Sequence, residues 1–193
     1  NDAPTLSATA SNPTFTEGSG SGVQGSAVSV FSGASVSTVE AGQTIAGLTF
    51  TVSGVVDGTN EKIIVDGTTL TLSSGSTGTT QTNGLSYSVT FNGTNKVSTV
   101  VLSGGSLTAS AAQTLVNGIQ YQNTSLDDPT SGSRVVTLTQ LVDSGSNVAP
   151  NSNTATLSIA STVTVTPIND APTLSATASN PTFTEGSGSG VQG

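Results

Sequence analysis

The stretch that decides the fold lies near the middle of the chain, where residues 62–72 read KIIVDGTTLTL. Asp66-Gly67 stands between two runs of β-branched and apolar residues, which is the strongest short hairpin signal in this sequence. Asn92-Gly93, between residues 85–91 and 96–102, indicates a second hairpin of the same kind. Two hairpins so close together predict a sheet of antiparallel strands.

Period-two alternation of apolar and polar residues continues on both sides of these hairpins and predicts further strands. The expected strands lie at residues 6–10, 27–31, 36–40, 45–52, 119–123, 135–142 and 154–166. Residues 73–84, rich in Ser, Thr and Gly, are expected to form a loop, and Gly-Ser repeats at 18–22 another.

In one stretch, the spacing of the apolar residues changes from that of a strand to that of a helix. Ala112, Leu115 and Val116 recur at helical spacing, so residues 110–117 are expected to form a short helix. Ser110 is the expected N-cap, and Gly118 stands where the helix should end. About nine or ten strands with one helix predict an all-β fold, an antiparallel Greek-key β-sandwich with one short helix. A barrel is the alternative, and a parallel α/β fold is excluded because crossover helices are absent.

A 25-residue stretch occurs twice without a change. Residues 1–25 read NDAPTLSATASNPTFTEGSGSGVQG, and residues 169–193 read the same. Identical stretches of this length do not arise by chance, so we expect a tandem array. Residues 1–168 would form one unit with its core at about 25–168, and residues 169–193 would begin the next unit.

Composition narrows the classes of function. Charged residues make up only 7% of the chain, and the net charge is −8. This charge argues against nucleic acid or an anionic membrane as a partner. No run approaches the length of a membrane span, so we expect no membrane insertion. Cysteine is absent, so stability must come from the core or from bound metal.

The C-terminal half carries a more specific pattern. Residues 110–145 read SAAQTLVNGIQYQNTSLDDPTSGSRVVTLTQLVDSG, and residues 161–172 read STVTVTPINDAP. These motifs, with the opening FTEG at residues 15–18, resemble the cadherin-like repeats of giant bacterial surface adhesins, which are often exported with RTX tails. The resemblance implies a cadherin/Ig-like sandwich, a secreted cell-surface location and Ca²⁺ between neighbouring repeats.

The resemblance also implies a set of Ca²⁺ ligands. Asn169 and Asp170 would be linker ligands, which we expect to share Ca²⁺ with Asp143 or Asp128 of the preceding unit. Carboxylates, amides and backbone carbonyls provide the oxygens that Ca²⁺ needs. The full candidate set is Asp143, Asp170, Asn169, Asp128, Asp127, Glu17, Asp57 and Glu40. The alternative is that these residues form Asx turns, and Asp66 is assigned to its hairpin turn.

Two departures from the family pattern weaken the expected sites. Pro167 replaces the first acid of the cadherin linker, and one linker Asn is missing. The strand near Val36 offers only Glu40 where relatives often carry two aspartates. Any metal site should therefore be poorer in carboxylates than a full cadherin site.

An enzymatic role is not expected. Histidine is absent, which excludes a Ser-His-Asp triad and His-ligated zinc. Asp127 and Asp128 are adjacent on a turn and diverge, and without Trp there is no stacking platform for sugars. The leading hypothesis is a structural extender repeat of an adhesin that acts in cell adhesion or biofilm. The alternative is a homotypic or glycan-binding adhesive module without structural calcium, in which chains also contact one another.

Overall fold

A computed structural model describes residues 1–20, 22–73, 75–172 and 174–190 of the chain. The loops expected at residues 18–22 and 73–84 each include one residue outside this set. The second copy of the duplicated stretch also has its last three residues, 191–193, outside it.

Among the described residues, the strands form three sheets. The largest has seven strands in the order β2 (Thr14–Thr16), β13 (Thr154–Thr166), β12 (Gly132–Asp143), β5 (Ile45–Ser53), β10 (Val97–Ser103), β9 (Ser86–Asn92) and β8 (Ser76–Thr79). The second has the order β3 (Val28–Ser29), β11 (Gln120–Asn123), β6 (Glu61–Val65) and β7 (Thr68–Thr71). The third pairs β1 (Thr5–Ala10) with β4 (Phe31–Ser37), and the helices are η1 (Gly58–Asn60) and α1 (Ala109–Asn117).

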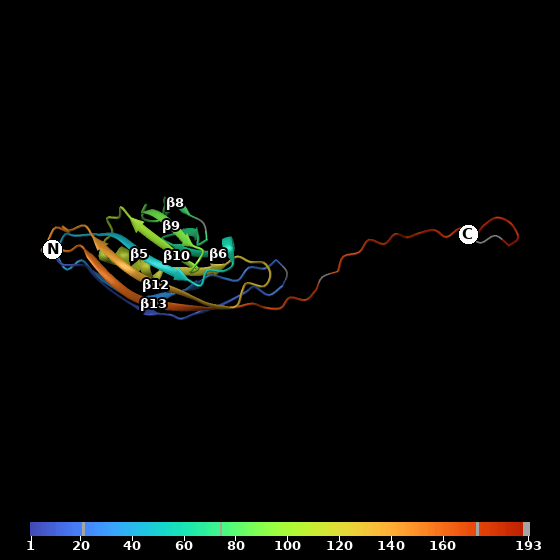
Figure 1. Ribbon diagram of the computed structural model, residues 1–193, viewed down its shortest axis with the longest axis horizontal. Helices are drawn as coiled ribbons and strands as arrows, with labels where there is room; N and C mark the ends of the chain where they lie inside the picture. Colours follow the sequence, from blue (N-terminus) through green and yellow to red (C-terminus); the bar gives the residue numbers. More distant parts are fainter. Residues whose placement is uncertain (21, 74, 173, 191–193) are drawn as a thin grey trace.

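This architecture confirms the predicted all-β sandwich with one short α-helix. Strands far apart in sequence are neighbours: β5 lies between β10 and β12. We call residues 1–168 the body. Figure 1 shows β12 and β13 running along the body, with the N-terminus at one end. The chain leaves the body at the other end as a tail, of which residues 169–172 and 174–190 are described.

Both predicted hairpins are present. Val65 pairs with Thr68 across a turn in which Asp66 and Gly67 have φ of 50° and 75°, the left-handed backbone that a type I′ turn needs. Asn92 pairs with Val97 across the second turn. These turns set the register of β6–β7 and β9–β10.

Three details of the prediction were wrong. The expected loop at residues 73–84 contains strand β8, which pairs with β9. Strand β2 runs parallel to β13, because Thr14 lies beside Thr164 and Thr16 beside Thr166. The helix begins one residue earlier than expected, and its N-cap is Thr108, whose side chain accepts a hydrogen bond from the Ala111 N–H.

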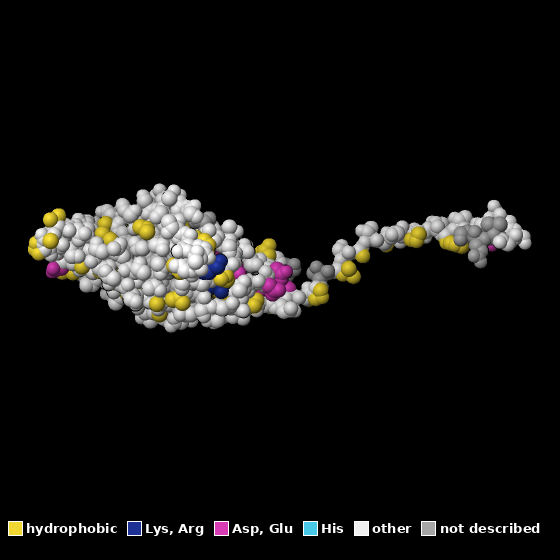
Figure 2. Space-filling view, viewed as in Figure 1, with side chains coloured by type: hydrophobic (Ala, Val, Ile, Leu, Met, Phe, Trp, Pro, Cys, Tyr) yellow, Lys and Arg dark blue, Asp and Glu magenta, His cyan; other side chains and the backbone are white. Residues whose placement is uncertain are grey.

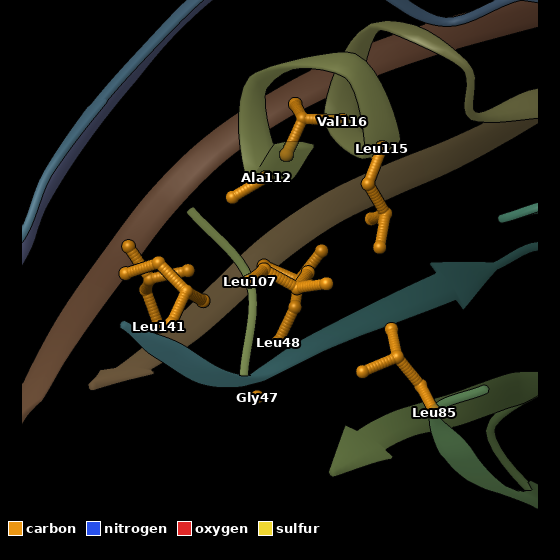
Figure 3. Close-up of a pocket in the computed structure, with 9 residues that line it drawn as sticks. Gly47, Leu48, Leu85, Leu107, Ala112, Leu115, Val116 and Leu141 are labelled. Carbon is orange, nitrogen blue, oxygen red and sulfur yellow. The ribbon is translucent and has the colours of Figure 1, made fainter. Parts of the chain in front are cut away.

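The helix closes one side of the core. Leu115 extends from α1 toward Leu107 and Leu48 in a small pocket (Figure 3). Apolar side chains and Gly47 line this pocket throughout, so it belongs to the packing of the core. The Ile45 N–H donates to the Leu107 carbonyl, and the Leu107 N–H donates to the Ile45 carbonyl. These two hydrogen bonds hold the residues before α1 against β5.

The first 25 residues belong to the core as well. Leu6 is 9% exposed and Phe15 only 1%. The Phe15 ring meets Tyr121 edge to face, with ring centroids 5.8 Å apart. The core thus includes residues before the expected boundary at residue 25, because β1 and β2 complete the sheets that the remaining strands leave open.

Candidate functional site: the two ends of the body

The candidate ligands are divided between opposite ends of the body. One end, which we call the Asn1 end, carries Asn1, Glu40 and Asp143. The opposite end, which we call the tail end, carries Glu17, Asp57 and the Asn169-Asp170 pair. The long antiparallel strands β12 and β13 separate the two ends, since β12 ends at Asp143 while β13 ends at Thr166.

At the Asn1 end, the Asn1 side chain is the centre of a polar cluster. Its amide nitrogen donates to the Ser152 carbonyl at 2.7 Å and to Asp143 Oδ1 at 3.5 Å, and its Oδ1 accepts from Gln43. The Asp2 backbone N–H donates to Glu40 Oε1 at 2.7 Å, and the Asn1 ammonium lies 3.9 Å from the same oxygen. We call Asn1, Glu40, Gln43 and Asp143 the Asn1 cluster.

The Asn1 cluster has oxygens left over. Among the described residues, four buried side-chain oxygens have no hydrogen-bond partner, and three belong to this cluster: Glu40 Oε2, Gln43 Oε1 and Asp143 Oδ2. Asp143 is only 1% exposed. Buried polar atoms are normally paired, so unpaired ones call for a water or an ion. An all-oxygen set with two carboxylates suits Ca²⁺ better than a softer metal.

At the tail end, the chain leaving β13 is fastened to the body. Glu17 is 3% exposed, and its Oε2 accepts a hydrogen bond from the Ile168 N–H at 2.9 Å. Asp170 Oδ1 accepts one from the Gly20 N–H at 2.9 Å. Glu17 Oε1 is the fourth buried oxygen without a partner among the described residues. Figure 2 shows acidic side chains gathered where the tail leaves the body.

Asp57 is a member of a buried ion network. Its Oδ2 accepts from Arg134 at 2.9 Å and from Asn123 at 2.7 Å. Arg134 also donates to Glu61 at 2.5 Å, and Glu61, which is fully buried, accepts from the Tyr121 hydroxyl at 2.8 Å. Asp57 therefore balances the charge of Arg134, and its Oδ2 already accepts from three donors, the third being the Thr130 N–H at 3.1 Å.

The network shifts the pKa of two of its members. Burial raises the pKa of Tyr121, and the charge of Glu61 raises it further. Burial acts to lower the pKa of Arg134, but the hydrogen bond and charge of Glu61 outweigh it, so the net direction is upward. Both groups keep their ordinary protonation: Tyr121 is neutral and Arg134 is charged.

The remaining candidates stand apart from these contacts. Asp127 and Asp128 are exposed on the turn between β11 and β12, and Asp128 has φ of 46°. Asn169 is exposed, and its side chain donates to the Asp170 carbonyl at 3.4 Å. The structure thus favours the turn reading for Asp127 and Asp128.

The expected sharing of Asp143 was wrong in one respect. Asp143 lies at the Asn1 end, and Asn169 and Asp170 lie at the tail end of the same unit, so they do not meet within it. The residue that Asp143 does contact is Asn1, the counterpart of Asn169 in the duplicated stretch. An array would therefore bring Asn169 to the Asp143 of the following unit, not to that of the preceding unit.

Sequence reasoning missed Gln43 and did not name Asn1. Neither carries a charge, so the search for carboxylates passed over both, although Asn1 is the repeat of the named Asn169. Among the described residues, no group of three or more His, Cys, Asp or Glu side chains is placed to hold a metal. The Asn1 cluster has two carboxylates, those of Glu40 and Asp143.

Comparison with known proteins identified no relative of this chain. No family model, curated protein or solved structure matches this chain. Among the described residues, no helix has the length and apolar character required to cross a membrane. What the structure defines is a β-sandwich with polar clusters at both ends.

Proposed function

We propose that this chain is one repeat of a tandem array in a secreted, cell-surface adhesin, where it acts as a structural extender. Its neighbours along the chain would be copies of itself, and its work would be to hold a ligand-binding domain away from the cell. The duplicated 25-residue stretch supports the array, since residues 169–193 supply again the segment that opens the body.

The observation that carries the proposal is the double use of one dipeptide. At the tail end, Asp170 accepts from the Gly20 N–H through its side chain. At the Asn1 end, Asp2 uses a different atom, its backbone N–H, and the Asn1 side chain donates to the body, whereas that of Asn169 donates to the neighbouring Asp170 carbonyl. The aspartate contacts of the two ends involve different atoms, so one Asn-Asp pair could bind both units at a junction.

Prolines add stiffness to the same junction. Pro167 and Pro172 flank the dipeptide, and each fixes its own φ and restricts the residue before it. The Ile168 N–H is bound to Glu17 of the body. A following unit would therefore leave at a restricted angle, as an extender requires.

Ca²⁺ fits the Asn1 cluster as a further stabiliser. The ion would neutralise Glu40 and Asp143 and tie them to the linker dipeptide. The unpaired oxygens of Glu40, Gln43 and Asp143 support this assignment. With two carboxylates, the expected affinity is that of an extracellular module, about 0.1–1 mM.

The test is a melt of a two-unit chain, made by continuing Gly193 into a second copy of residues 26–193. The second Asn1 cluster in this chain is then preceded by a peptide bond instead of a free ammonium. At 100 times Kd, one site stabilises the fold by about 2.7 kcal/mol. We expect the melting temperature to rise with Ca²⁺ and much less with Mg²⁺.

The matched variants change one carboxylate in both units. Asp143→Asn should abolish the calcium response, while Asp127→Asn, at the exposed turn, should keep it. A melt that is the same in Ca²⁺ and in chelator would remove calcium from the proposal. The extender role would then rest on the direct contacts of the dipeptide.

A further inference from the structure

Exposed large apolar side chains of the body gather at its two ends. Val39 precedes Glu40 at the Asn1 end, where Val148 also lies, between β12 and β13. At the tail end, the Val56 N–H donates to Glu61, and Leu126 lies on the turn before β12. Among the described residues of the body, the exposed set is completed by Val23. Figure 2 shows hydrophobic side chains at the end opposite the tail. Apolar side chains gathered in this way indicate surfaces that meet a partner.

Val39 is held in a conformation that does not suit its side chain. It has φ of 69°, in the left-handed region, where a β-branched residue is an outlier. The Val39 N–H donates to Ser37 Oγ at 3.1 Å, and the Glu40 N–H donates to the Thr38 carbonyl at 2.8 Å. The side chain is 52% exposed, so burial within its own body does not account for a valine here. Strain of this kind points to a function outside the body.

Val23 lies where the linker aspartate is attached to the tail end. Its N–H donates to the Gly20 carbonyl at 3.1 Å, and the Gly20 N–H donates to Asp170 Oδ1 at 2.9 Å. Its side chain packs over Gly18, where a Cβ would lie 2.7 Å from Val23 Cγ1. The rest of the side chain is open, with 48% of it exposed. Val23 therefore presents an apolar surface directly beside the junction.

One aspartate would bring these two valines together in an array. The Asp2 N–H donates to Glu40 Oε1 at 2.7 Å, and Asp170 is the Asp2 of the following unit. Its carboxylate would then bind Gly20 of one unit while its N–H binds Glu40 of the next. Two hydrogen bonds and one aspartate span roughly 10 Å. Val23 is three residues from the first anchor and Val39 is adjacent to the second, so their side chains come within reach of each other.

We propose that Val23 of one unit packs against Val39 of the following unit and forms an apolar contact across the junction. The inference rests on the proposed function, since it needs units in tandem, and it names the residues by which one body meets the next. The partner is the Asn1 end of a second copy of this unit. The contact removes two half-exposed valines from water and does not depend on calcium.

This contact explains why a valine is found at a position with positive φ. Glycine or asparagine would adopt that backbone with less strain. Neither has the branched apolar side chain that could cover Val23. The strain is present in every unit, and the contact at the junction offsets it.

The first experiment is a disulfide test on the two-unit chain. The natural sequence has no cysteine, so an introduced pair is the only one that can close. Val23→Cys in the first unit is combined with Val39→Cys in the second, and closure by oxidised glutathione is followed by mass and by non-reducing electrophoresis. Closure requires Cα atoms about 4.4–6.8 Å apart. We expect this pair to close within one chain.

The control for simple tethering replaces Val23→Cys with Asp127→Cys, at the exposed turn of the same end. A flexible junction would bring either residue to Val39→Cys of the second unit at a similar rate. A fixed contact should close the Val23 pair faster, on the order of a hundredfold. Equal rates for the two pairs would overturn the proposal.

The second experiment uses Val39→Asn, which separates the contact from the stability of the unit. Asparagine tolerates the left-handed backbone, so the melting temperature of the 193-residue chain should stay the same or rise. In the two-unit chain, the same change in the second unit should broaden the distance distribution from small-angle scattering. In the first unit, where no body precedes Val39, it should leave the distribution unchanged. A lower melting temperature of the 193-residue chain would show that Val39 serves its own unit and would overturn the proposal.

The dimension of the two-unit chain distinguishes failure of this inference from failure of the extender role. An extended chain whose Val23 pair closes no faster than the Asp127 pair keeps the extender role and contradicts the valine contact. A compact chain contradicts the extender role, and the valine contact with it. An extended chain in which the Val23 pair closes selectively supports both.

Discussion

Arg134 connects two acidic side chains inside the tail end of the body. Its side chain is 2% exposed, and those of Asp57 and Glu61 are 10% and 0% exposed. Charges in such surroundings are tolerated only when they are paired and hydrogen-bonded. The network thus explains why one of the three basic residues of the chain lies in its interior.

Replacing Arg134 should be costly. Arg134→Met leaves Glu61 and Asp57 without their cation, and breaking a buried pair in this way costs about 3–5 kcal/mol. Lys62→Met is the control, since Lys62 is half-buried and donates to Thr71 at 2.7 Å on the β6–β7 hairpin. Urea unfolding of both variants checks the difference. Similar losses for the two would contradict a special role for the network.

Tyr121 makes the free energy of unfolding depend on pH in the alkaline range. Its pKa is raised in the folded chain by burial and by Glu61, so folding favours the neutral phenol. The stabilisation is complete below the unfolded pKa, about 10, and is lost as the pH rises through the folded pKa. Over that window, Tyr121 should lower the free energy of unfolding by about 1.4 kcal/mol per pH unit.

The measurement is urea unfolding at a series of pH values above 9, for the parent chain and for Tyr121→Phe. The variant should be less stable at neutral pH, because Glu61 loses a hydrogen bond at 2.8 Å. The two curves should converge as the pH rises. Parallel curves would show that Tyr121 does not titrate between the two states.

At the residue scale, the sequence named acids at strand ends as ligands, and that assignment stays a prediction. Three of them, Glu40, Asp143 and Glu17, carry buried oxygens without a hydrogen-bond partner among the described residues. Asp57 has the same kind of sequence surroundings but pairs with Arg134. The sequence does not reveal that pairing because the two residues meet only after β12 and η1 are in place.

At the scale of elements, the sequence predicted those elements whose conformation is determined by residues close together in the chain. The Asp66-Gly67 and Asn92-Gly93 hairpins were predicted because their turns are determined by residues within the turn. Strand β8 was missed because residues 76–79, STGT, have no apolar alternation, and their pairing with β9 decides their conformation. The parallel β2–β13 pair joins segments about 150 residues apart in the sequence, Thr14–Thr16 and Thr164–Thr166, and leaves no local signal.

The duplicated stretch makes the same point more sharply. Residues 5–10 form β1 in one copy, whereas the described residues of the identical tail copy form no strand. The difference lies in the partner strands β4 and β13, which only the first copy contacts. In this chain, strand formation depends on tertiary pairing more than on propensity.

The helix cap offers a test at the scale of one element. The Thr108 side chain accepts from the Ala111 N–H at 3.1 Å, so Thr108→Ala should cost about 1 kcal/mol. Ser110→Ala is the control at the residue that sequence reasoning chose, and it should change stability by less than about 0.5 kcal/mol. Thermal unfolding compares the two variants. A larger loss for Ser110→Ala would place the cap at Ser110.

At the scale of the whole molecule, the body is elongated (Figure 1). Its two polar clusters lie at opposite ends. Strand β13 alone has 13 residues and spans about 43 Å. If units follow one another through the Asn-Asp dipeptide, that length adds along the array. The account therefore depends on whether the dipeptide holds two units in line.

Small-angle scattering of the two-unit chain measures this most directly. We expect a maximum dimension close to that of two bodies in line. Asp170→Ala, which removes the acceptor for the Gly20 N–H, should shorten the chain or broaden its distribution while each unit keeps its melt. Asp2→Ala is the matched control, since it changes the same residue at the free end, and it should leave the dimension unchanged. A two-unit chain that is compact, or that keeps its full length after Asp170→Ala, would contradict the junction described above.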